Sequence, residues 1–173
     1  VALAIGVVLV DDQFLALCDS AGPERCAPAG GRHTAAERFD RLSARLKRAP
    51  IPAPGAQPPL SAPQKLGYAD LLISQFHAIR APRTWPTNAA NLAAALRGDG
   101  STLESAAGAS NTPGAWALIT PSTAIQCADA SAHRSLPAWP TVIARFARIS
   151  RLPGAPRGWW QRAPSAACTD RGE

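Results

Sequence analysis

The clearest structural signal in the sequence is the stretch Thr34-Ala-Ala-Glu-Arg-Phe-Asp-Arg-Leu-Ser-Ala-Arg-Leu-Lys-Arg-Ala-Pro50. It predicts an α-helix that begins after Thr34, because Thr34 and Glu37 stand three residues apart, like the two partners of a capping box. Pro50 would end the helix. Apolar residues recur every three to four positions and would form one buried stripe: Ala35, Phe39, Leu42 and Leu46.

The segment before this helix opens with an apolar run over residues 1–10, expected to be a strand or the first turns of a buried helix. The run is too short to span a bilayer. Residues 11–20 look helical. Gly22-Pro23 would end that element, and Ala29-Gly-Gly31 would make a second break.

The segment after the helix begins with a proline-rich connector, residues 50–63, which holds six prolines. Further helices are predicted beyond it, one of them opening at Trp85-Pro86 and stopping at Gly98. Residues 101–109 would add a short helix, and a short strand is expected near Ala124-Ile125. The predicted buried faces are Tyr68, Leu72, Phe76 and Ile79; then Ala89, Leu92 and Leu96; and last Trp139, Val142, Phe146 and Ile149.

These elements predict a mostly α chain with three parts. Residues 1–49 hold the first helices, residues 50–63 form a stiff connector, and residues 64–173 hold the remaining helices. An apolar content of 46% fits a globular chain rather than a disordered one.

The net charge of +6 raises the question of a nucleic-acid partner. The four arginines of the central helix fall three to four residues apart: Arg38, Arg41, Arg45 and Arg48. Because no aromatic residues are interleaved with them, we interpret them as a solvated helix face and predict no nucleic-acid partner. No segment is long and apolar enough for a membrane span, so we predict no membrane partner.

Residues capable of chemistry are scattered. No G-x-S-x-G pentapeptide is present, and neither Ser101 nor Ser110 has the flanking glycines of a nucleophile elbow. The three histidines, His33, His77 and His133, are interpreted as loop, packing or surface residues. Asp129 and His133 are too close in sequence to supply the geometry of a triad. We therefore predict no catalytic residue, no cofactor-binding residue and no metal ligand in this chain.

The five tryptophans, Trp85, Trp116, Trp139, Trp159 and Trp160, are expected to pack in the core, with the wall of a substrate pocket as the alternative. The four cysteines are Cys18, Cys26, Cys127 and Cys168. None lies in a C-x-x-C pair, which argues against zinc, and three disulfide pairings are open. Free buried thiols are the other possibility, while an even count fits an exported protein.

Several segments in order resemble secreted actinobacterial α/β-hydrolases of the tripeptidyl-aminopeptidase type, which are prolyl-aminopeptidase-like serine peptidases. The segments are Phe14-Leu-Ala-Leu-Cys-Asp-Ser-Ala-Gly-Pro-Glu-Arg-Cys-Ala27, Leu46-Lys-Arg-Ala-Pro-Ile-Pro52, Trp85-Pro86 followed by Leu92 to Leu96 and Gly98-Asp-Gly100, and Ala124-Ile-Gln-Cys-Ala-Asp129. Trp139-Pro140 and Trp159-Trp160 continue the register. The chain departs from the pattern at Pro28, where an aromatic residue is common, and at Ser165, where a cysteine is expected and Cys168 follows three residues late.

The resemblance implies that the chain is the helical cap or lid of a serine hydrolase whose core is a parallel sheet. The nucleophile would precede this segment, and the acid and histidine would follow it. The expected partners are a peptide or small acyl substrate and the remainder of the hydrolase core, without a cofactor. The parent would be secreted or in the cell envelope, with Cys18 bonded to Cys26 across Gly22-Pro23 and Cys127 left to pair with Cys168.

Two alternatives remain: a small helical binding module, and a non-functional truncated gene product. Because the sequence contains no methionine, we expect it to be an internal piece of a larger protein. As a piece of a hydrolase, its helices would lose the sheet that they cover, and their apolar stripes would be left exposed.

Overall fold

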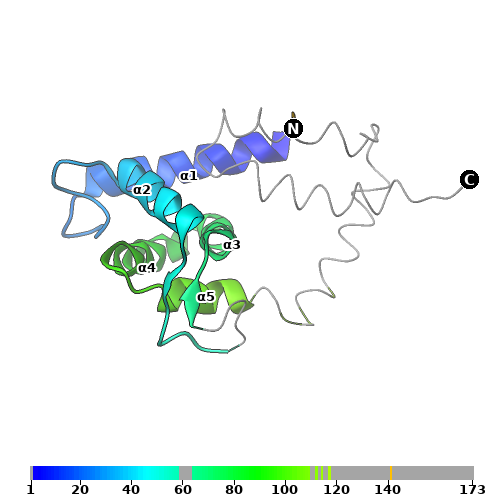
Figure 1. Ribbon diagram of the computed structural model, residues 1–173. Coiled ribbons are helices and arrows are strands. Elements are labelled where there is room, and N and C mark those ends of the chain that lie inside the picture. Colours follow the sequence, from blue (N-terminus) through cyan, green and yellow to red (C-terminus); the bar gives the residue numbers. More distant parts are fainter. Residues whose placement is uncertain are drawn as a thin grey trace, which may run out of the picture. The chain divides into compact units, whose positions relative to one another are not determined.

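The computed structural model (Figure 1) describes residues 2–58 and 64–109, together with positions 112, 114, 117 and 141. Side chains within the first helix are described from Val10 onward. One compact unit spans Val1–Thr112, and a second spans Pro113–Glu173.

The first unit is mostly helical, as predicted. The elements in chain order are α1 (Ala2–Ala21), α2 (Ala35–Arg48), β1 (Ile51–Pro52), β2 (Lys65–Leu66), α3 (Tyr68–Ile79), the 3₁₀ turn η1 (Pro82–Thr84), α4 (Trp85–Arg97) and α5 (Ser101–Gly108). Helix α3 is central, because it packs against α1, α2, α4 and α5 (Figure 1).

Helix α1 resolves the question left open for the apolar run, which is helical and continuous with residues 11–20. The helix ends at Ala21 because Gly22 takes a φ of +76° and its amide donates to the Asp19 carbonyl at 3.2 Å. No helix in the described part of the chain combines the length and the apolar character needed to cross a bilayer.

Helix α2 has the capping box that the sequence predicts. The Glu37 amide donates to Thr34 Oγ1 at 3.1 Å, and the Thr34 amide donates back to Glu37 Oε2 at 3.0 Å. The helix ends at Arg48, and Ala49 is extended in front of Pro50. The predicted apolar stripe is buried, and Ser43 is buried beside it.

The two short strands were not predicted. Ile51 pairs antiparallel with Leu66, and Pro52 with Lys65, so the expected connector begins as part of a small sheet. Ile51, Ala53 and Leu66 are buried, which makes this segment part of the core. A two-residue strand is too short to show an alternating pattern, and Pro52 argues against a strand from sequence alone.

The buried face of α3 is rotated from the predicted one. Leu72 and Ile79 are buried as expected, but Tyr68 and Phe76 lie at the margin of the face and are partly exposed. The positions that fill the centre are Leu71, Ser74 and Gln75. The prediction favoured large apolar residues, whereas the packing of α3 against four helices also buries polar ones.

Helices α4 and α5 follow the predicted pattern closely. Pro86 lies in the first turn of α4, and Gly98 ends the helix with a φ of +104°. Ala89 and Leu92 are buried, and Leu96 is at the edge. The predicted short helix is α5, which ends one residue earlier than expected, at Gly108.

The expectation that these apolar stripes need a sheet for burial is wrong for the described helices. Phe39, Leu72 and Leu92 are each at most 4% exposed, and the helices bury them against one another. Among the described side chains, Leu17 is the one large apolar residue that is exposed. The described parts of these helices therefore form a core with one another. The predicted strand near Ala124-Ile125 and the helix opening at Trp139-Pro140 lie outside the described residues.

Candidate functional site

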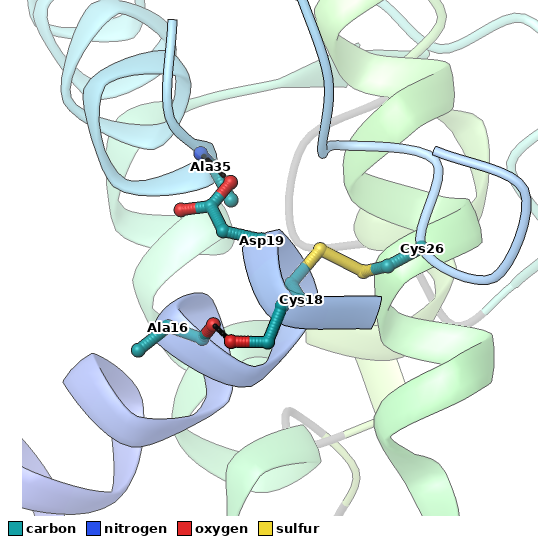
Figure 2. The surroundings of a disulfide bond; sticks show 6 residues. Ala16, Cys18, Asp19, Cys26 and Ala35 are labelled. Carbon is teal, nitrogen blue, oxygen red and sulfur yellow. Dashed lines mark hydrogen bonds between the residues drawn. A yellow bond between two sulfur atoms is a disulfide. The ribbon is translucent and has the colours of Figure 1, made fainter. Parts of the chain in front are cut away.

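The disulfide predicted between Cys18 and Cys26 is present, with a Cα separation of 5.2 Å (Figure 2). Next to it, Asp19 Oδ1 accepts a hydrogen bond of 2.8 Å from the Ala35 amide, the first residue of α2. Bridge and carboxylate together tie the end of α1 to the loop after it and to the start of α2. Cys127 and Cys168 lie outside the described residues, so their pairing stays a prediction.

Ser101 is held in a structural network. Its hydroxyl donates to Asp99 Oδ1 at 2.5 Å and accepts from the Gly55 amide at 3.0 Å. Hydrogen bonds from the Ser101 side chain and amide hold the pKa of Asp99 below its usual value. A second hydroxyl, Ser105 Oγ, accepts from the Gln57 amide at 2.8 Å. The two serines thus fasten residues 55–57 to α5, and the side chain of Ser101 is 8% exposed.

The two described histidines have surface surroundings. His33 Nδ1 lies 3.3 Å from Glu37 Oε2 and 3.2 Å from a nitrogen of Arg41. His77 is on α3 beside the Phe76 ring, and partial burial and then the nearby Arg80 charge lower its pKa. The structure therefore gives these two residues surface and packing roles. His133 and Asp129 lie outside the described residues, as does Ser110.

The arginines of α2 lie on one side of the helix, as their spacing predicts. Arg38 donates to the Gly30 carbonyl, and Arg41 contacts His33. Arg45 and Arg48 are exposed near the carboxyl end of the helix, where cations interact favourably with the helix dipole.

The most distinctive feature of the core is a buried chain of three polar side chains, which we call the polar chain: Asp11, Gln75 and Asn88. Gln75 Nε2 donates to Asp11 Oδ1 at 2.7 Å, and Asn88 Nδ2 donates to Gln75 Oε1 at 2.8 Å. The three residues come from α1, α3 and α4, and each is at most 2% exposed. Asn88 Oδ1 has no hydrogen-bond partner among the described residues.

The sequence held one signal for the polar chain. Asp11 is spaced three, four and seven residues before Phe14, Leu15 and Cys18, so it belongs to an apolar stripe in which it is the polar exception. Its partners could not be found in the same way, because Gln75 and Asn88 look like ordinary surface residues of helices.

An aromatic pair lies one turn from the polar chain. Phe14 and Trp85 meet edge to face with ring centroids 5.6 Å apart, and Trp85 Nε1 donates to the Ile79 carbonyl at 3.2 Å. Trp85 is partly buried and contacts α1 and α3 through Phe14 and Ile79, so it lies at the edge of the core rather than inside it. The other four tryptophans lie outside the described residues.

The hollow described within this unit is closed and apolar. The hollow between α2 and α4 is lined only by apolar contacts and leaves no room for a water molecule; its lining is Pro28, Ala35, Phe39, Leu42, Leu92 and Leu96. Within the described residues, no three His, Cys, Asp or Glu side chains are grouped so that they could hold a metal.

Tyr68, the one tyrosine in the sequence, gives a direct test of the packing of α3. Burial raises the pKa of Tyr68 to about 12, and its hydroxyl has no hydrogen-bond partner among the described residues. We expect phenolate absorbance to titrate near this pH in the folded chain and near pH 10 in denaturant. The folded state then holds its proton longer, so stability falls as pH rises from 10 to 12. A folded-state midpoint at pH 10 would show that Tyr68 is solvated. The variant Tyr68→Phe has no phenolate and gives the background absorbance.

Comparison with known proteins gives no match: no protein-family model, no curated protein and no solved structure is similar to this chain.

Proposed function

We propose that the chain is the cap or lid of a serine hydrolase with the α/β-hydrolase fold, an exopeptidase that removes short peptides from N-termini. The observation that carries the proposal is the order of the segments that resemble this class. Three of them fall on described residues: Phe14–Ala27, Leu46–Pro52 and Trp85–Gly100.

The structural roles of these segments support the proposal. The first contains the Cys18–Cys26 disulfide, the second the stop of α2 and strand β1, and the third the turn that joins α4 to α5. Each segment thus contains a connection between helices. The resemblance therefore extends to the way in which the helices are joined.

In this proposal the chain helps to bind the substrate and to exclude water, and it takes no part in the reaction itself. The cap covers the substrate pocket, selects a peptide or small acyl substrate and keeps water out. The nucleophile, the acid and the histidine come from the remainder of the hydrolase. Neither a cofactor nor a metal is needed for acyl transfer of this kind. A disulfide between buried cysteines favours an oxidising compartment and so a secreted or cell-envelope parent.

A second candidate is a small helical binding module. One observation favours it: the described helices bury their apolar stripes against one another and leave Leu17 as the one exposed large apolar side chain among them. A core closed in this way does not require a hydrolase sheet beneath it.

The coding sequence on either side of this region separates the two candidates. The hydrolase proposal requires an in-frame G-x-S-x-G upstream and an aspartate and histidine downstream. The joined protein should cleave a chromogenic tripeptide anilide, and replacing the elbow serine with alanine should abolish the activity. Absence of the elbow, or a joined protein without peptidase activity, would overturn the hydrolase proposal.

The chain by itself should neither cleave aminoacyl esters nor react with a fluorophosphonate probe. Its one described candidate, Ser101, donates its proton to a carboxylate and is buried. The measurement is probe labelling followed by mass spectrometry, with an active serine peptidase as the positive control. A labelled serine anywhere in the chain would contradict the proposal that the nucleophile lies elsewhere.

A further inference from the structure

Helix α1 presents one polar side chain on its described buried face. Asp11, Phe14, Leu15 and Cys18 recur every three to four residues, and each is at most 3% exposed. Upstream of Asp11, the run from Ala2 to Val10 contains no polar side chain. Asp11 is therefore the polar exception on the described buried face of α1.

Apolar burial alone does not fix where such a helix sits. The hydrophobic effect is non-directional and depends on the area removed from water. If α1 slid by one turn, about 5.4 Å, other apolar residues of the run would take the vacated places. Many placements would then bury similar areas, so one more interaction has to select among them.

The polar chain supplies a directional interaction at the required place. The hydrogen bond from Gln75 to Asp11 is 2.7 Å long, so a slide of one turn breaks it and leaves a buried carboxylate without that donor. Gln75 cannot turn to follow, because Asn88 donates to the other end of its amide. Asn88 on α4 therefore fixes the orientation of the Gln75 amide, and through it the position of Asp11.

The other anchor of α1 acts on a different neighbour. Asp19 accepts from the Ala35 amide and joins the end of α1 to α2, and the disulfide closes a loop that begins on α1 itself. Neither contact reaches α3 or α4. The polar chain, by contrast, joins α1 to both of these helices through side-chain hydrogen bonds.

We propose that Asp11, Gln75 and Asn88 form a register lock, which selects one axial and rotational position of α1 on α3 and α4. Its main contribution is selectivity, because a buried polar group gains little net stability over an apolar one of similar size. A single buried polar residue fixes register in coiled coils by the same physics.

The test uses the full chain labelled with 5-fluorotryptophan. Trp85 reports the position of α1, because its ring contacts Phe14, and its fluorine resonance is assigned with Trp85→Phe. The native chain should give one Trp85 resonance. The triple variant Asp11→Leu/Gln75→Leu/Asn88→Leu should melt at the same or a higher temperature, yet give several Trp85 resonances and a weakened nuclear Overhauser effect between the two rings.

Two further variants make the test decisive. Asp11→Asn keeps the acceptor oxygen and should keep the single resonance. Ser43→Ala removes a buried hydroxyl that has no partner among the described residues, and it should change neither readout. One unchanged Trp85 resonance in the triple variant would overturn the lock, because apolar packing would then suffice. A triple variant that fails to fold would also overturn the proposal, since the polar chain would then be needed for stability rather than for the position of α1.

Discussion

Replacing Cys18 and Cys26 with alanine should lower the free energy of unfolding by about 2–5 kcal/mol. The bridge joins residues eight apart, and in the chain-entropy model a loop of this size accounts for roughly 2–3 kcal/mol. The remainder comes from packing, because both cysteines are buried and the loop that the bridge holds carries Ala29 into the core. The loss should therefore exceed that of a bridge between exposed residues.

The measurement is urea unfolding of two matched chains. Both carry Cys127→Ser and Cys168→Ser, so that they differ only in the Cys18–Cys26 bridge. Amide exchange of Ala35 should also accelerate in the variant, since the end of α1 is then free to move Asp19 away from it. Equal midpoints for the two chains would mean that the bridge is incidental to the fold.

Replacing Gly100 with alanine should lower the free energy of unfolding by about 2–4 kcal/mol. An added Cβ would lie 2.4 Å from Leu66 Cβ and 3.2 Å from Ile51 Cγ1. The Leu66 Cβ is attached directly to strand β2 and cannot swing aside, so the backbone must move. That movement also strains the hydrogen bond of 2.8 Å from the Gly100 amide to the Pro52 carbonyl.

Gly98→Ala is the control. Gly98 lies in the same turn, but an added Cβ there would strain the backbone without a clash. Nothing approaches within 4 Å of an added Cβ there, but the backbone has a φ of +104°. Its replacement should cost about 1 kcal/mol of conformational strain without a clash. Thermal melting of both variants separates the two effects. An equal or larger loss at Gly98 would show that the packing of the turn against β2 is loose.

The fold was predictable where a few neighbouring residues determine it. Thr34 and Glu37 cap α2 through hydrogen bonds between residues three apart in sequence. Gly98 ends α4 through its positive φ. The Cys18–Cys26 bridge could be proposed because a turn at Gly22-Pro23 brings its ends together. Each of these signals is complete within one short segment, so the rest of the chain does not change its meaning.

The candidate site was predictable only in part. The scattered serines and histidines suggested no catalytic group, and that stays a prediction. Of the described residues, Ser101 bonds to Asp99 and Gly55, and His33 contacts Glu37. The two strands and the polar chain were not foreseen. Ile51 becomes a strand residue only because Leu66 lies beside it, and Gln75 becomes a core residue only because α1 and α4 each bring a polar partner.

By itself, the sequence determined where α2 and α4 start and stop, because capping, glycine conformation and proline geometry act over a few residues. The tertiary structure alone decided which face of α3 is buried and which polar groups meet there. Asp11 is 64 residues from Gln75, and Asn88 is 13 residues from it on another helix. Whether a buried amide is tolerated depends on partners at such distances, which only the packed chain brings within hydrogen-bonding range.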